Sequence, residues 1–105
     1  MRKIYLLFFI LFFHLNSFAT EIKYEIVVSD LEVPWAFVFL PDNSMLITER
    51  KGELIHFKNG EKNIIKNLPK IISKNQGGLL DIELHPNFKE NGWIYIAYSL
   101  SLIHI

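Results

Sequence analysis

The stretch MLITERKGELIHFKNG, residues 45–60, decides the fold. It contains two apolar runs, residues 45–49 and 53–58, which are joined by the short RKG segment and followed by an Asn-Gly pair. Asn-Gly between apolar runs is a strong signal for a tight hairpin turn. The stretch therefore predicts consecutive antiparallel strands, with a further strand in the NIIKNL run at residues 63–68.

Two runs upstream of this stretch also have the composition of strands. IKYEIVVS, residues 22–29, alternates and is β-branched, and WAFVFL, residues 35–40, is aromatic-rich and typical of a strand buried on both faces. Pro34 separates the two runs, and the Pro-Asp-Asn segment at 41–43 supplies a turn. The 35–40 run and the hairpin-linked strands predict a four-stranded antiparallel meander, the unit of a β-propeller blade.

The downstream residues begin to repeat this pattern. KIISKNQGG has no clear period and predicts a loop that crosses to a second sheet, which starts with LLDIEL at residues 79–84. His-Pro and Asn-Gly pairs then break the chain before WIYIAYS, residues 93–99, returns as the next strand. We therefore expect an all-β chain with one complete blade and the start of a second, whose open edges need neighbours outside this chain.

The N-terminus, MRKIYLLFFILFFHLNSFAT, has the organisation of a secretory signal peptide. Arg2 and Lys3 precede an apolar run that is shorter than the roughly 20 residues of a membrane-spanning helix. We expect residues 1–19 to be removed after Ala19 and the mature protein to be periplasmic or secreted, without stable insertion in a membrane. A retained anchor is the alternative.

Charge and cysteine content exclude several classes of partner and linkage. The expected cleavage removes two of the eleven Lys and Arg residues and none of the eleven Asp and Glu residues, so the mature chain is slightly acidic. Such a charge does not favour nucleic acid or an anionic membrane surface. The chain has no Cys, which excludes disulfides and Cys-linked lipids.

The last six residues, LSLIHI at 100–105, follow a predicted strand without a turn signal. The DNA string CTGTCTCTTATACACATC encodes them in one frame and looks like a transposon-end adapter used in sequencing libraries. We therefore expect residues 100–105 to derive from an adapter and residues 20–99 to form the native part of the mature chain. A genuine extension of the strand is the alternative.

Several motifs occur together in one order: PWA, FLPD, TER, QGGLL and HP-F. With them the chain resembles the soluble sugar dehydrogenases that use pyrroloquinoline quinone (PQQ), the glucose/sorbosone dehydrogenase family. The resemblance runs from about Asp30 to Ser99, and Asn75 stands where Gly is frequent in that family. It implies a six-bladed β-propeller, of which this chain is an N-terminal fragment with the first blade and the start of the second.

The resemblance also implies a function for the whole protein. By the resemblance, the whole protein is expected to be an exported quinoprotein oxidoreductase that oxidises an aldose-type sugar by hydride transfer to PQQ, with calcium holding and polarising the quinone. Gln76 matches the family Gln that faces the quinone and the sugar. Its neutral amide can donate to an oxygen or accept from a hydroxyl without adding charge. Gly77 and Gly78 are expected to adopt unusual backbone angles and let the main chain approach the flat cofactor.

The resemblance places the catalytic base His and the calcium ligands downstream, so no catalytic or metal residue is predicted in this chain. Two other functions are alternatives: an extracellular propeller that binds without catalysis, and a calcium-dependent, lactonase-like propeller. The downstream His and calcium ligands would separate these functions, and the Gln-Gly-Gly loop argues weakly against a lactonase. A purely structural role for Gln76 and the two glycines is the alternative for the site.

Other polar residues are expected to be structural. His85 precedes Pro86 and is expected to shape a turn. His56 lies within a predicted strand without acidic or His neighbours at ligand spacing. Glu49 and Arg50 of the TER motif are expected to pair across blades or to lie near the channel; the resemblance favours a structural ion pair, and direct contact with the cofactor is the alternative. Asp81 lies in the strand after the Gln76 loop and receives no role.

Overall fold

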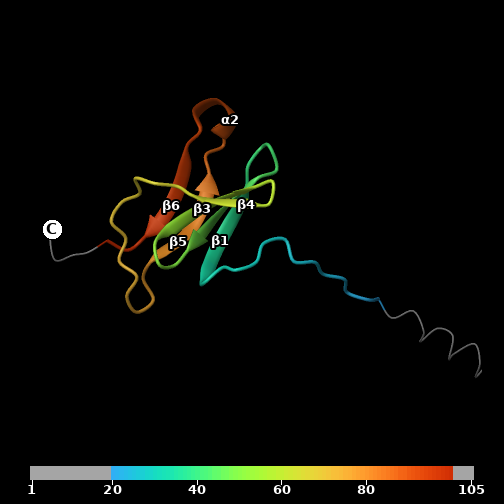
Figure 1. Ribbon diagram of the computed structural model, residues 1–105. Coiled ribbons are helices and arrows are strands. Elements are labelled where there is room, and N and C mark those ends of the chain that lie inside the picture. The colour runs from blue at the N-terminus through green and yellow to red at the C-terminus, as the bar shows by residue number, and fades with distance from the viewer. Residues whose placement is uncertain (1–19, 101–105) are drawn as a thin grey trace, which may run out of the picture.

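A computed structural model of the chain describes residues 20–100 (Figure 1). The expected signal peptide and residues 101–105 of the expected adapter segment lie outside the described residues. The described elements are, in chain order, β1 (Pro34–Phe39), β2 (Met45–Glu49), β3 (Glu53–Lys58), β4 (Glu61–Ile64), β5 (Leu79–Leu84), the short helix α2 (Phe88–Asn91) and β6 (Ile94–Tyr98).

The strands form two antiparallel sheets. One has four strands in the order β1-β2-β3-β4, and the other pairs β5 with β6. Ile47 in the centre of β2 lies opposite Phe37 in β1 and Ile55 in β3, so adjacent strands in the chain are also neighbours in the sheet. These sheets confirm the all-β prediction of one complete blade followed by the start of a second.

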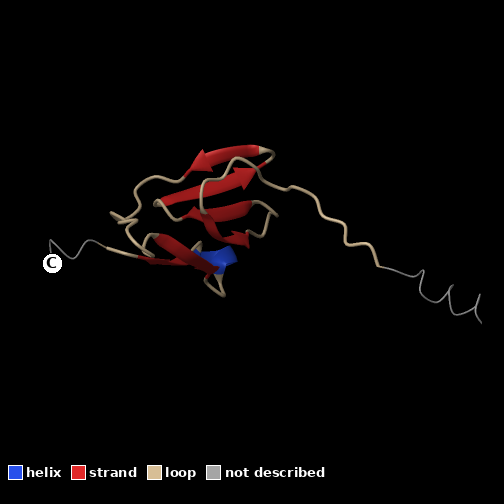
Figure 2. Cartoon of the chain, turned by 90° about the horizontal axis from the view of Figure 1, so that it is seen from below, coloured by secondary structure: helices blue, strands red, loops and turns tan. Residues whose placement is uncertain are grey.

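The core lies between the two sheets, which form separate layers (Figure 2). Leu46 and Leu54 of the first sheet pack with Leu79 and Ile82 of the second, and Leu54 and Leu79 are fully buried. Because successive side chains of a strand point to opposite faces, Leu46 and Leu54 reach this core, while Ile47 and Ile55 belong to a cluster on the other face. Burial of these leucines orients the second sheet against the first.

The opposite face of the first sheet is only partly covered. Met45 and Ile47 are buried beneath the N-terminal segment, but Trp35, Phe37 and Phe39 of β1 are 54%, 56% and 58% exposed. The prediction that residues 35–40 are buried on both faces is therefore wrong for this chain. Burial on both faces needs a layer on each side, and the described residues supply a full layer on one side alone.

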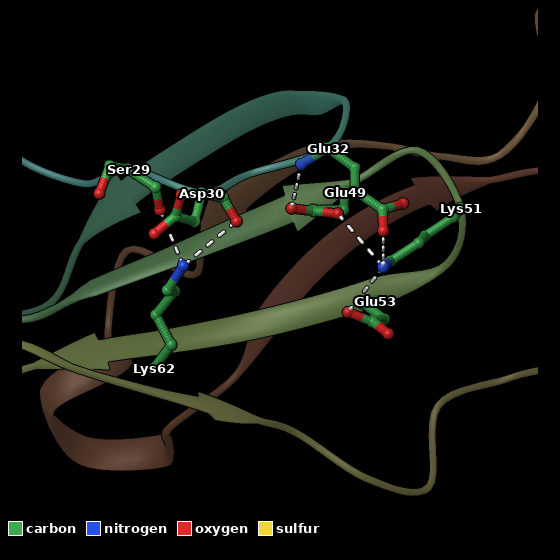
Figure 3. Close-up of polar contacts among 7 residues, drawn as sticks. All are labelled: Ser29, Asp30, Glu32, Glu49, Lys51, Glu53 and Lys62. Carbon is green, nitrogen blue, oxygen red and sulfur yellow. Dashed lines mark hydrogen bonds and ion pairs between the residues drawn. The ribbon is translucent and has the colours of Figure 1, made fainter.

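Residues 22–29 do not form the predicted strand. Their side chains lie largely in solvent, with Tyr24 91% exposed. An alternating pattern gives a strand only where a sheet edge offers hydrogen-bonding partners, and this segment pairs with no edge among the described residues. It is held at its end by Lys62 Nζ, which donates to the carbonyls of Ser29 at 2.7 Å and Asp30 at 3.2 Å (Figure 3).

The fourth strand occupies Glu61–Ile64 instead of residues 63–68. It starts directly after the Asn59–Gly60 turn and ends where Ile65 and Leu68 fold onto the core cluster. Burial of these two side chains takes the chain out of the sheet. Within residues 20–100, no helix has the length and apolar character to cross a membrane.

Candidate functional site

Gln76 lies at the tip of a tight turn in the segment that crosses from the first sheet to the second. The turn is closed by the Gly77 N–H, which donates to the Lys74 carbonyl at 2.8 Å. Asn75 adopts the left-handed conformation with φ of 57°, which Asn tolerates better than most residues and Gly tolerates best. The Gln76 side chain is exposed, and none of the hydrogen bonds found among residues 20–100 uses its amide. Its amide is therefore free to bind a ligand.

Arg50 ties this turn to the first sheet. Its Nε donates to the Gly77 carbonyl at 3.0 Å, and its own carbonyl accepts from the Leu79 N–H at 3.1 Å. The Arg50 N–H donates to the Val33 carbonyl at 3.0 Å, immediately before β1. The Gln76 turn consequently shares an edge of the molecule with the turn between β2 and β3.

Ser99 ties the same turn to the second sheet. Its hydroxyl accepts from the Gly78 N–H at 2.9 Å, and its own N–H donates to the Gly78 carbonyl at 2.9 Å. The Ser99 carbonyl also accepts from the Ile72 N–H at 3.0 Å. The residue that follows β6 therefore holds the crossing segment before and after Gln76.

The two glycines pack tightly against these partners. A Cβ on Gly78 would overlap the Arg50 carbonyl oxygen and lie 2.7 Å from Arg50 Cγ. A Cβ on Gly77 would overlap the Ser99 hydroxyl and lie 3.1 Å from Ser99 Cβ. The expected unusual backbone angle occurs at Gly78, with φ of 148°, but not at Gly77. Arg50 and Ser99 thus fill the space beside the glycines, and contact of the glycines with a cofactor stays a prediction.

Of the two charged TER residues, Glu49 forms a structural ion pair, with Lys51 at 3.8 Å, whereas none of the ion pairs among residues 20–100 includes Arg50. Neighbouring strand residues point to opposite faces, so Arg50 reaches Gly77 while Glu49 turns to the N-terminal segment. The Glu49 side chain is 3% exposed; its Oε1 accepts from the Glu32 N–H at 3.0 Å, and its Oε2 has no hydrogen-bond partner.

Lys51 supplies positive charge beside this carboxylate (Figure 3). Its ammonium lies 3.0 Å from Glu32, 3.5 Å from Glu53 and 3.8 Å from Glu49 Oε2. The hydrogen bond to Glu32, together with the three nearby carboxylates, raises the pKa of Lys51 above its ordinary value. This cluster anchors the N-terminal segment to the turn that contains Arg50.

The two described histidines have structural contacts. His56 Nε2 lies 2.9 Å from the Ser44 hydroxyl, as expected of a satisfied strand residue. His85 Nδ1 accepts from the Asn87 N–H at 3.0 Å, which confirms its role in shaping the turn before α2. Asp81 is exposed, and its Oδ1 accepts from the following N–H. Residues 20–100 contain no group of three His, Cys, Asp or Glu side chains placed to hold a metal ion.

Sequence reasoning missed the roles of Thr48 and Ser99. The Thr48 hydroxyl donates to the Leu80 carbonyl in β5, which is 32 positions away, and Ser99 reaches back 21 positions to Gly78. The TER motif marks Thr48, but no local pattern links either residue to its partner. Such contacts emerge only when the two sheets are placed together.

Comparison with known proteins gives one consistent family. The sequence model described as Glucose / Sorbosone dehydrogenase matches residues 31–102. The aldose sugar dehydrogenase YliI of Escherichia coli K12 is 41% identical in an alignment of 81 residues that covers 74% of this chain and 22% of that protein. The quinoprotein glucose dehydrogenase B of Acinetobacter calcoaceticus is 36% identical over 78 residues, 70% of this chain and 16% of that protein.

Solved structures agree with this result. An oxidoreductase from Thermus thermophilus, described as a glucose dehydrogenase, superposes with a TM-score of 0.64 and 42% identity over 69% of this chain and 21% of its own. The apo form of the soluble E. coli aldose sugar dehydrogenase superposes with a TM-score of 0.63 and 44% identity, over 67% of this chain and 21% of its own. The chain spans about a fifth of the length of these relatives. It belongs to the glucose/sorbosone dehydrogenase family.

Proposed function

We propose that this chain is the N-terminal part of an exported quinoprotein that oxidises an aldose-type sugar by hydride transfer to PQQ. Family membership supports the reaction class, and the names of the relatives support both an aldose and a quinone. The hydrophobic leader supports export to the periplasm or the medium. In the proposal an external acceptor then receives the electrons.

The observation that carries the proposal is the side chain of Gln76, which is exposed and unpaired among the described residues. Its side chain is exposed at the tip of a turn whose backbone is hydrogen-bonded to both sheets. A free amide on a rigid support can donate to a quinone or sugar oxygen and accept from a sugar hydroxyl. Because the amide is neutral, it orients these groups without opposing the arrival of hydride.

PQQ fits this edge of the molecule through Gln76 more readily than through the glycines. Gln76 offers a donor and an acceptor to a ligand, whereas Arg50 and Ser99 already occupy the space beside Gly77 and Gly78. When bound, PQQ supplies the hydride acceptor. In this proposal Gln76 orients the reacting oxygens, and the hydrogen-bonded turn holds the backbone that carries its side chain.

Calcium, which would hold and polarise the quinone, belongs to the proposal for the complete protein. Three acidic residues beside the turn that contains Arg50 surround the Lys51 ammonium: Glu32, Glu49 and Glu53. An ammonium there supplies the positive charge that these carboxylates require. We therefore assign calcium to residues outside this chain, together with the catalytic base.

The test uses the complete protein, expressed from source DNA read past the Ser99 codon. We expect the frame to continue and to encode a base His and calcium-binding carboxylates. Loaded with PQQ and calcium, the protein should reduce a redox dye when D-glucose is added. A Gln76→Ala variant should lose on the order of 10²-fold in kcat/KM, the effect of removing one oriented donor.

The matched control is Lys74→Ala, because Lys74 lies on the same turn with an exposed side chain. Its kcat/KM and its Kd for PQQ, followed by absorbance titration, should equal those of the native protein. Sugar oxidation without added quinone would contradict the proposal. So would a Gln76→Ala protein with native kcat/KM and native Kd for PQQ.

A further inference from the structure

The turn that carries Gln76 is held by two side chains from different sheets. Arg50 follows the last residue of β2, and Ser99 follows the last residue of β6. We infer that Arg50 and Ser99 are positioning residues that hold the backbone from which the Gln76 side chain extends. This inference rests on the proposed function, because it concerns the group that is proposed to face the quinone and the sugar.

The two side chains bind opposite ends of one peptide group. The group joins Gly77 to Gly78: its carbonyl oxygen accepts from Arg50 Nε at 3.0 Å, and its N–H donates to the Ser99 hydroxyl at 2.9 Å. Since a peptide group is planar, bonds to both polar atoms fix the orientation of its plane. The first sheet thus holds one end of this group, and the second sheet holds the other.

The preceding peptide group is fixed as well. It joins Gln76 to Gly77, and its N–H donates to the Lys74 carbonyl at 2.8 Å. Two successive peptide groups on the C-terminal side of Gln76 therefore have hydrogen-bonded partners. An exposed side chain at a turn tip is usually mobile, but here the backbone that carries it is ordered.

The glycine pair is explained by the same arrangement. A Cβ at Gly77 would overlap the Ser99 hydroxyl, and a Cβ at Gly78 would overlap the Arg50 carbonyl oxygen. Only a chain without side chains at both positions lets Arg50 and Ser99 approach the shared peptide group. Two glycines, which would otherwise make the loop flexible, are thus the point at which the loop is held, and the backbone that carries Gln76 is in place before any ligand binds.

The inference is tested in the complete protein loaded with PQQ and calcium. Ser99→Ala removes the hydroxyl, and Arg50→Met removes the Nε donor but keeps the aliphatic stem. Each variant is made in the native and in the Gln76→Ala background. The control is Ser73→Ala, which removes an exposed hydroxyl from the same segment. The measurements are kcat/KM with D-glucose, the Kd for PQQ, and amide hydrogen exchange at Gly77 in quinone-free protein.

We expect each positioning variant to lower kcat/KM roughly 10- to 100-fold in the native background, the range that a displaced binding group produces. The same change should have little further effect in the Gln76→Ala background, because the amide to be positioned is gone. Exchange at Gly77 should become faster in Ser99→Ala and Arg50→Met and stay unchanged in Ser73→Ala.

Equal fold losses in both backgrounds would overturn the inference, because the residues would then act independently of Gln76. Unchanged exchange at Gly77 in both variants would also overturn it, since the turn would be ordered without them. A different result, in which Gln76→Ala alone leaves kcat/KM and Kd at native values, would overturn the proposed site and the positioning role with it. The two failures are therefore distinguishable.

Discussion

Thr48 in β2 donates a hydrogen bond of 2.6 Å to the carbonyl of Leu80 in β5. The same hydroxyl accepts from the Ala36 N–H in β1 at 3.1 Å, and the Thr48 residue is fully buried. One oxygen therefore connects two strands of the first sheet to the first strand of the second. Apolar side chains fill the space between the sheets, but such contacts are not directional. The hydrogen bond requires Thr48 of β2 and Leu80 of β5 to lie next to each other.

The Thr48→Val substitution should destabilise the complete protein. Val has nearly the shape of Thr, so the change removes the hydroxyl and leaves the Ala36 N–H and the Leu80 carbonyl without this partner. We expect the free energy of unfolding to fall by about 1–3 kcal/mol, the cost of unpaired buried groups. Urea denaturation measures the loss. Thr48→Ser keeps the hydroxyl and should lose less; equal losses in the two variants would show that packing by the methyl group dominates.

The turn residues of the hairpins made strands β2 and β3 predictable. The predictions for residues 22–29 and 35–40 were wrong because those segments lack neighbouring strands or layers in this chain. Asn59–Gly60 and the two apolar runs at residues 45–49 and 53–58 specify a local structure that needs no distant segment, and β2 and β3 begin and end as predicted. Residues 22–29 and 35–40 have equally strong patterns, but their structure depends on what lies beside them. Residues 22–29 pair with no sheet edge among the described residues, and residues 35–40 are covered by other residues on one face only.

The sequence predicted the candidate site only in part, and its role in binding stays a prediction. The motif identified Gln76, and the structure places it at the tip of an exposed turn. The supports were not predictable, because Arg50 and Ser99 lie 27 and 21 positions from the glycines that they bind. Hydrogen bonds of this kind depend on how the two sheets pack, for which the local sequence contains no signal.

Acid should weaken the turn between β1 and β2 through Asp42. Hydrogen bonds from the Ser44 hydroxyl and N–H, and then from Lys58, lower the pKa of Asp42 well below its ordinary value. The pKa of Asp42 in the folded protein lies below the unfolded value of about 3.9. The contribution of ionised Asp42 to stability is therefore complete above that pH and is lost as the pH falls toward the folded pKa. Thermal melts of native protein and Asp42→Asn should differ most near neutral pH and converge in acid. A constant difference in Tm would contradict this assignment.

The aromatic face of β1 should make the isolated chain self-associate. Phe37 and Phe39 are 56% and 58% exposed and pack edge to face at 5.6 Å between ring centroids, next to Trp35. Contiguous apolar surface of this kind drives association. Replacing both phenylalanines by Thr should lower the sedimentation coefficient of the isolated chain and its binding of a hydrophobic dye. Tyr24→Thr is the control, because Tyr24 is 91% exposed but lies outside the sheets; an equal effect there would argue against a specific face.

Gly78 should tolerate a methyl group far less well than Gly60. Both residues have positive φ, 148° and 78°, so Ala is strained at either position. A Cβ at Gly60 meets nothing within 4 Å, whereas a Cβ at Gly78 would overlap the Arg50 carbonyl oxygen. The Arg50 backbone cannot move aside without breaking its hydrogen bonds to Val33 and Leu79.

We therefore expect Gly78→Ala to lower the free energy of unfolding of the complete protein by on the order of 1–3 kcal/mol more than Gly60→Ala, as overpacking does. Because the displaced Arg50 also holds the Gly77 carbonyl, the Kd for PQQ should rise in Gly78→Ala and stay native in Gly60→Ala. Equal stability of the two variants would mean that backbone strain alone requires glycine here. If Gly78→Ala destabilises the protein but leaves the Kd for PQQ at its native value, the close packing at Gly78 serves the stability of the fold and not the binding of PQQ by Gln76.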